Sequence, residues 1–148
     1  MASGWTPVRD ELRTTLEGAD LGLRRVKRGV GDLAGLVESG AGRALFDNGY
    51  FISITSLNLG PYMQVLSTER TLGFEIYTGA NVGSDYGESL DALIERCELI
   101  AQKLHNCNAN VPSAKIVTLS GDVTFNHMLD EAAQVFAIMP YRVVYRMP

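Results

Sequence analysis

The feature that most constrains the fold is a stripe of apolar side chains that recurs every three or four residues in the second half of the chain. The stripe consists of Leu90, Leu93, Ile94, Cys97, Ala101 and Leu104. This spacing predicts an amphipathic helix over about residues 88–105, because residues three and four apart share one helix face. Polar residues over 84–89 can cap its start. Such a helix must bury its apolar face against another layer, which we expect to be a sheet.

Strand patterns lie on both sides of this helix. Alternating or β-branched apolar runs occur over residues 50–57, 70–78, 115–119, 123–125 and 132–147. The first two runs are expected to pair as an antiparallel meander, and the short run after Gly121 continues the strand before it. Pro140 interrupts the last run, which predicts an edge position or a bulge because proline has no N–H to donate to the ladder. A further short strand is predicted within 21–28.

A first helix is predicted near the N-terminus. Thr6 is the expected N-cap and Pro7 the first helical residue, and Val8, Leu12 and Leu16 then share one face. Six glycines between residues 29 and 49 predict loops and a mobile segment there. The 148 residues match one domain. The order of patterns predicts a single α+β domain over residues 1–148, with both helices packed on a largely antiparallel sheet.

Composition excludes some classes of protein. The net charge of −4 and the pI of about 5.1 argue against a dedicated nucleic-acid binder, which is usually strongly basic. The N-terminal residues lack the basic and apolar regions of a signal peptide, and no apolar run approaches the roughly 18 residues that cross a bilayer. We therefore expect a protein made in a cytoplasm, with reduced cysteines and no membrane contact.

The sequence contains no strong catalytic or metal-binding motif. The possible metal ligands are Cys97, His105, Cys107 and His127, which lack zinc-site spacing. His127 with Ser120 and Asp130 is the best nucleophilic set, but no G-x-S-x-G turn supports it. We expect Cys107 in a polar loop and His127 in a loop or turn. Gly29 and Gly31 begin no phosphate-binding pattern, so the prediction is a non-enzyme without cofactor or metal.

Two groups of residues are candidates for contact with partners. The first is the basic cluster Arg24, Arg25, Lys27 and Arg28, which either keeps a solvated strand edge from pairing or faces DNA phosphates or an acidic partner. The second lies on the closing strand and consists of Phe136, Tyr141, Arg142, Tyr145 and Arg146. Tyrosine and arginine are enriched at subunit interfaces, although a strand buried on both faces has a similar composition.

The order of elements resembles the tail terminator, or tail completion, proteins of long-tailed bacteriophages. The matching stretches are a helix over 7–16, an irregular segment, strands over 50–54 and 72–77, a helix over 89–104, and the closing run Pro140-Tyr141-Arg142-Val143-Val144-Tyr145-Arg146. That run is similar to the aromatic-Arg-Val-x-Tyr strand of the family. The match covers most of the chain as a pattern of elements. The glycine-rich stretch over 29–49 is longer than the family pattern.

The resemblance implies a homo-oligomeric ring, usually of six subunits, at the head-proximal end of the tail tube in the virion. Such a ring stops growth of the tube, joins the neck and lets the genome pass, so its partners are the tube protein, a neck protein and non-specific DNA. The family has no known catalytic residue. The alternatives are a head–tail connector of the neck, a bacterial peptide-binding adaptor or chaperone-like domain that uses an edge strand, and a small enzyme that uses His127 or Cys107.

Overall fold

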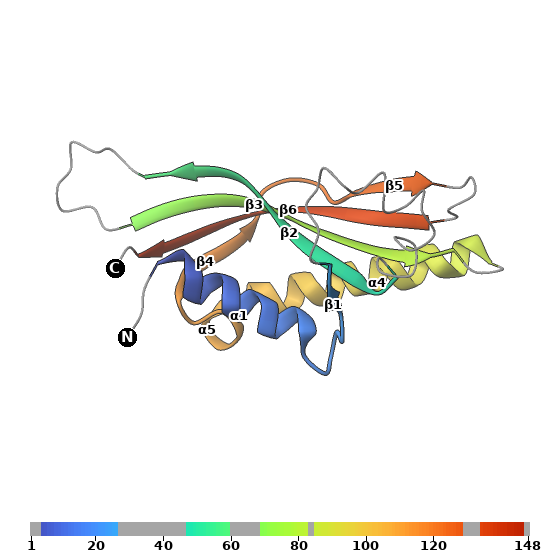
Figure 1. Ribbon diagram of the computed structural model, residues 1–148, viewed down its shortest axis with the longest axis horizontal. Helices are drawn as coiled ribbons and strands as arrows, with labels where there is room; N and C mark the ends of the chain where they lie inside the picture. The colour runs from blue at the N-terminus through green and yellow to red at the C-terminus, as the bar shows by residue number, and fades with distance from the viewer. Residues whose placement is uncertain (1–3, 27–46, 60–68, 83–84, 129–133, 147–148) are drawn as a thin grey trace.

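The computed structural model describes residues 4–26, 47–59, 69–82, 85–128 and 134–146. Its elements in chain order are α1 (Trp5–Glu17), β1 (Arg24–Arg25), β2 (Gly49–Asn58), β3 (Glu69–Asn81), α4 (Tyr86–His105), α5 (Cys107–Asn110), β4 (Ala114–Leu119), β5 (Thr124–Met128) and β6 (Gln134–Arg146). They form one strongly twisted sheet with α1 and α4 on the same face (Figure 1). The predicted α+β fold, with two helices on a largely antiparallel sheet, is confirmed.

The sheet runs in the order β1-β2-β3-β6-β4, and β5 also pairs with β6. All pairs are antiparallel except the short pair between β1 and β2. β4 pairs with the C-terminal half of β6 and β5 with its N-terminal half, so the two short strands follow one another along one side of β6. The expected meander of β2 and β3 and the expected continuation of β4 into β5 are therefore present.

β6 is an interior strand, so the predicted edge position for Pro140 is wrong. Its neighbours are β3 on one side and β4 and β5 on the other. The Ser120 amide donates to the Pro140 carbonyl over 2.9 Å, which shows that the backbone groups of Pro140 face the gap between β4 and β5. In a strand the N–H and C=O of one residue point to the same side. The missing N–H of Pro140 therefore removes no ladder bond.

The main core lies between the helices and the sheet. From α1 and α4 it receives Val8, Leu12, Leu16, Leu93, Cys97, Ile100 and Leu104. Ile100 is fully buried although the predicted stripe did not include it. Phe74 lies near the centre, stacked on Tyr141 with ring centroids 5.7 Å apart and tilted against Trp5 at 6.1 Å. Burial of so many large side chains on one face fixes both helices to it.

Specific polar contacts also hold the helices in place. In α4, Arg96 donates to the Thr78 hydroxyl over 3.0 Å and to the Gly79 carbonyl over 2.8 Å. In α1, the Glu11 carboxylate accepts from the Ser113 amide over 2.8 Å and from its hydroxyl over 2.6 Å. These hydrogen bonds tie α4 to the end of β3 and α1 to the residue just before β4, at opposite ends of the sheet, and hydrogen bonds of charged groups are stronger than neutral ones.

The helix starts differ from each other in their capping. α4 begins as predicted, because the Asp85 side chain accepts a hydrogen bond from the Glu88 amide over 3.0 Å. α1 begins at Trp5 with Gly4 at the N-cap position, so the prediction of Thr6 as the cap is wrong. Pro7 still lies in the first turn, where its missing N–H costs nothing. The reason for the earlier start is that Gly4 joins the sheet through its N–H bond to the Arg146 carbonyl.

A second, smaller cluster covers part of the opposite face. Val26, Phe51 and Phe136 are buried there, and Phe51 stacks on Tyr77 with ring centroids 4.5 Å apart. Most of the predicted glycine-rich segment over 29–49 lies outside the described residues. In the part of the chain that the structure describes, no helix is long and apolar enough to cross a membrane.

Candidate functional site

The structure describes half of the predicted basic cluster. Arg24 and Arg25 form β1 and are both exposed, whereas Lys27 and Arg28 lie outside the described residues. Arg24 donates to the Asp47 carbonyl over 2.9 Å. Arg25 is in register with Tyr50, whose side chain is in the main core, so Arg25 projects from the helix side of the sheet and Arg24 from the other side.

Arg13 lies beside Arg25, and Arg9 lies farther along α1. Arg13 and Arg25 line one shallow hollow, and both lie close enough to influence the Tyr50 hydroxyl. Arg9 is one helical turn before Arg13 on α1. Arg9 and Arg13 were not predicted as a site, although their spacing of four on a predicted helix places both on one side of it. We call Arg9, Arg13 and Arg25 the basic face.

The five candidate interface residues on β6 do not form one surface. Tyr141 and Tyr145 are buried in the main core, and Phe136 is buried in the cluster on the opposite face. Arg142 and Arg146 are exposed on that opposite face. The division of these residues between two faces could have been predicted from the sequence, because residues an odd number apart on a regular strand point to opposite faces.

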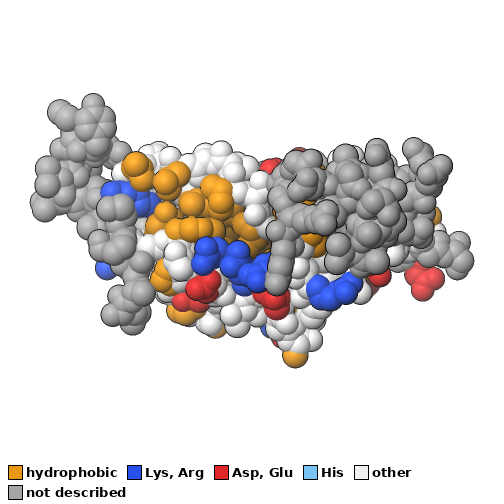
Figure 2. Space-filling view, viewed as in Figure 1, with side chains coloured by type: hydrophobic (Ala, Val, Ile, Leu, Met, Phe, Trp, Pro, Cys, Tyr) orange, Lys and Arg blue, Asp and Glu red, His pale blue; other side chains and the backbone are white. Residues whose placement is uncertain are grey.

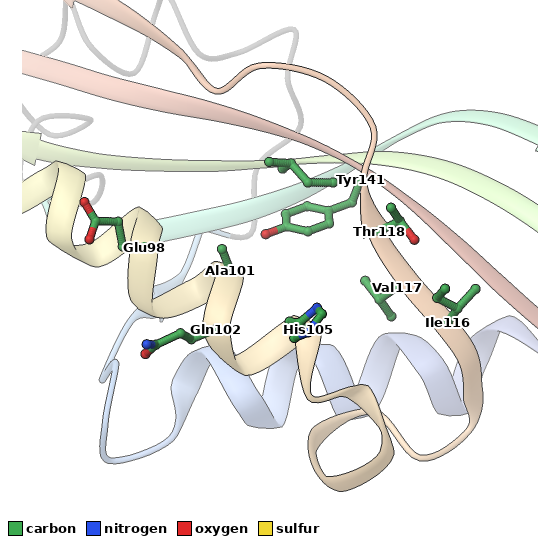
Figure 3. A pocket seen from close by; sticks show the side chains of 9 residues that line it. Glu98, Ala101, Gln102, His105, Ile116, Val117, Thr118 and Tyr141 are labelled. Carbon is green, nitrogen blue, oxygen red and sulfur yellow. The ribbon is translucent and has the colours of Figure 1, made fainter.

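A groove runs between α4 and β4 (Figure 3). It has a volume of about 770 Å³ and is lined from α4 by Glu98, Ala101, Gln102 and His105, and from the sheet by Ile116, Val117, Thr118, Leu119 and Tyr141. Ile116 and Leu119 are 50% and 41% exposed, which is high for large aliphatic side chains. The groove therefore offers apolar contact area next to an edge strand.

Tyr141 forms the floor of this groove. Figure 3 shows its ring extending from β6 toward α4, above Ala101 and His105 in this view. Its hydroxyl oxygen is buried and has no hydrogen-bond partner among the described residues. Burial also raises the pKa of the Tyr141 hydroxyl above its usual value, so it is a neutral potential donor.

A second apolar surface lies at the far edge of the sheet. Ile54, Leu57 and Leu59, at the end of β2 and just beyond it, are 48%, 51% and 55% exposed. Figure 2 shows apolar side chains gathered over this part of β2 and the adjacent β3, with a row of basic side chains below them. A bulge between Ile54 and Ser56 shifts the register, so Leu57 pairs with Leu72 and shares the helix side with Ile54. We call Ile54, Leu57 and Leu59 the β2 patch.

The cysteines and histidines lie apart from these surfaces or at their rim. The prediction of Cys107 in a polar loop is wrong, because it is buried in α5, where its thiol donates weakly to the Lys115 carbonyl. Cys97 is buried in α4, and burial raises its pKa to about 11, which keeps it protonated at neutral pH. His127 lies in β5 rather than a loop, hydrogen-bonded to the Tyr86 hydroxyl. No three potential metal ligands converge among the described residues.

No protein-family model matches the chain, and no curated protein matches it. The two apolar surfaces and their flanking charges are therefore the basis for a functional interpretation.

Proposed function

We propose that this protein is a ring-forming structural subunit of a bacteriophage tail, a tail terminator that closes the head-proximal end of the tail tube and joins it to the neck. The observation that carries the proposal is that the sheet exposes apolar side chains at two different edges, at the β2 patch and in the groove beside β4. Two unlike surfaces on opposite edges suit a head-to-tail contact, which generates a ring when the rotation closes.

The order of elements also supports this proposal. The resemblance implied an N-terminal helix, paired strands, a long second helix and a closing strand, and the described elements follow this order. On this proposal the ring has six subunits, sits at the head–tail junction of the virion and contacts the tube protein, a neck protein and passing DNA. Of the cluster, Arg24 is the described residue that we assign to such a partner, because Arg25 projects from the helix side of the sheet toward α1.

One observation favours a second candidate, a peptide-binding adaptor. A groove between a helix and an edge strand is the form of site to which extended peptides add as an extra strand. The buried Tyr141 hydroxyl places one polar group without a hydrogen-bond partner among the described residues at the base of this groove. The two functions differ in assembly state, because the adaptor acts as a monomer or dimer and the tail terminator as a closed ring.

Native mass spectrometry over a concentration series, with negative-stain imaging of the same samples, tests the proposal. We expect closed rings of one size, six subunits above all. A single closed species rather than a ladder of lengths is the important readout, because open head-to-tail contacts give filaments. A chain that remains monomeric at all concentrations and binds extended peptides along β4 would favour the adaptor instead.

A further inference from the structure

We propose that the ring is joined by sheet continuation, in which β2 of one copy adds to the outer edge of β4 in the next copy and Ile54 enters the groove beside α4. This inference rests on the proposed ring and identifies its subunit joint. The occupant of the groove is thus a second copy of this chain. Four properties of the two edges support the pairing: their backbone groups, their side-chain faces, their direction and their charge.

The backbone groups of both edges are available for pairing. Tyr50 and Asn48 accept hydrogen bonds from Val26 and Arg24, which shows that even-numbered residues at the start of β2 point their carbonyls outward. Backbone groups alternate along a strand, so those of Ile52 and Ile54 face the same outer edge. β1 ends its pairing at Tyr50, and no strand pairs with this edge after Tyr50 in the described part of the chain.

The outer edge of β4 is arranged in the same way. The Ser120 amide points inward to Pro140, so the backbone groups of Val117 and Leu119 point outward. Within the described ranges, β4 has only β6 as a neighbour in the sheet. Each edge therefore presents two residues whose N–H and C=O groups are directed away from the sheet.

The side chains of these residues lie on matching faces. Ile52 and Ile54 pair with Ile76 and Phe74 on the helix side of β3, and Val117 and Leu119 pair with residues on the helix side of β6. In a continuous sheet, residues on the helix side of one copy stay on the helix side of the next. Ile54 would then lie against Leu119 and Ala101, which line the groove. Each edge thus covers apolar side chains that the other exposes.

The direction of the strands is compatible with ring closure. β2 is antiparallel to β3, β3 to β6, and β6 to β4, so β2 and β4 run in opposite directions within one copy. A rotation about an axis along the strands preserves direction, so neighbouring copies would pair β2 and β4 antiparallel. The contact is heterologous, because it joins two different edges.

Charge distinguishes the two sides of the joint. On α4, exposed carboxylates follow one helical stripe at Glu88, Asp91, Glu95 and Glu98, and Glu98 lines the groove. On the other side, Arg13 and Arg25 line a hollow beside α1 that Asp10 and Glu17 also line, and Figure 2 shows a row of basic side chains below the apolar side chains over β2 and β3. When β2 meets β4, the basic face of one copy approaches the acidic stripe of the next. Complementary charge of this kind favours unlike edges over like ones.

Two lysine substitutions at exposed positions test the joint. Ile54→Lys blocks the β2 edge and Leu119→Lys blocks the groove, and neither position is in the buried core. Each variant alone should lose every species above the monomer in native mass spectrometry. An equimolar mixture should form one-to-one pairs and nothing larger, because only one intact joint remains between the two variants. Ala19→Lys, in the exposed turn after α1, is the matched control and should assemble as the parent does.

Cross-linking provides a second measurement. Ile54→Cys is mixed with Leu119→Cys and treated with a short bismaleimide, and the two native cysteines are buried and interfere little. A cross-linked dimer that forms in the mixture but in neither variant alone supports the joint. A dimer from Ile54→Cys alone would indicate a symmetric contact and overturn the proposal, as would no cross-link at the highest soluble concentration.

These outcomes separate the joint from the proposed function. Rings that persist in both lysine variants refute the joint and leave the ring function intact. A mixed cross-link in a chain that never forms a closed ring supports the joint and counts against the tail terminator. A free extended peptide that occupies the groove and prevents cross-linking, without any self-association of the parent chain, would refute the joint in favour of the adaptor.

Discussion

Replacing Tyr141 with phenylalanine should stabilise the isolated subunit. The ring of Tyr141 stacks on Phe74 and both are buried, so phenylalanine keeps these contacts. Only the hydroxyl is lost, and this hydroxyl is buried without a hydrogen-bond partner among the described residues. A buried polar group without a partner costs about 1–3 kcal/mol relative to the solvated state.

The magnitude follows from this cost. We take the lower end, about 1 kcal/mol, because the groove is open to solvent beside the helix. For a domain of this size, 1 kcal/mol corresponds to a rise of about 3 °C in Tm.

Tyr50→Phe is the matched control in the same sheet. Tyr50 is also fully buried, but its hydroxyl donates to the Glu17 carboxylate over 2.8 Å. Removing it loses a hydrogen bond at a partly exposed carboxylate, for which we expect a loss of about 1 kcal/mol and a fall of about 3 °C in Tm. The two tyrosines should therefore respond with opposite signs to the same chemical change.

The assay is urea unfolding followed by circular dichroism, at a protein concentration where the chain is monomeric, with Tm as a second readout. Unchanged slopes with a shifted midpoint would show that stability alone changed. If Tyr141→Phe lowers the free energy of unfolding as much as Tyr50→Phe does, the Tyr141 hydroxyl has a partner in solution and the argument from its burial is wrong.

Two further predictions concern the same sheet. Burial raises the pKa of Tyr50 and of Tyr141 above the usual value of 10, and for Tyr50 the contact with Glu17 adds to the shift. Above about pH 10 the unfolded chain loses these protons while the folded chain keeps them. The free energy of unfolding should therefore fall as the pH rises through this range. Urea unfolding at about pH 9 and about pH 11 should show a smaller loss in the double phenylalanine variant than in the parent. Gly73→Ala should destabilise by about 1–2 kcal/mol, because its Cβ would lie 2.5 Å from the Ser56 hydroxyl oxygen and 2.9 Å from that of Thr55. Calorimetry should show part of this loss restored by adding Ser56→Gly, and an unchanged Tm in Gly73→Ala would refute the steric argument.

Local periodicity was sufficient to predict the main elements. The stripe over 90–104 and the alternation over 70–78 predicted α4 and β3 with small errors at their ends. Both depend on side chains that repeat with the period of one element, which is information carried by neighbouring residues. The fold class followed because one helix face and one sheet face must cover each other.

The order of strands in the sheet could not be predicted in this way. Pairing of β6 with β3 joins residues such as Thr71 and Val144, which are distant in the sequence. Pro140 suggested an edge, and only the gap between β4 and β5 explains how it fits an interior strand. The basic face could not be predicted for the same reason, because Arg13 and Arg25 come together only through the packing of α1 beside β1.

The chemistry of the outer edge of β2 is unusual for a chain that acts alone. Exposed edge strands are normally protected by lysine, proline or a bulge that discourages pairing with other chains. Residues 52–58 of β2 contain no charged residue and no proline, although one bulge interrupts them, and three large aliphatic side chains there and just beyond are about half exposed. An unprotected edge on a free subunit would promote uncontrolled growth. A head-to-tail contact that closes after a fixed number of copies covers every such edge, as a barrel does within one chain. In the proposed assembly, the angle between successive copies therefore decides between a finite ring and a filament.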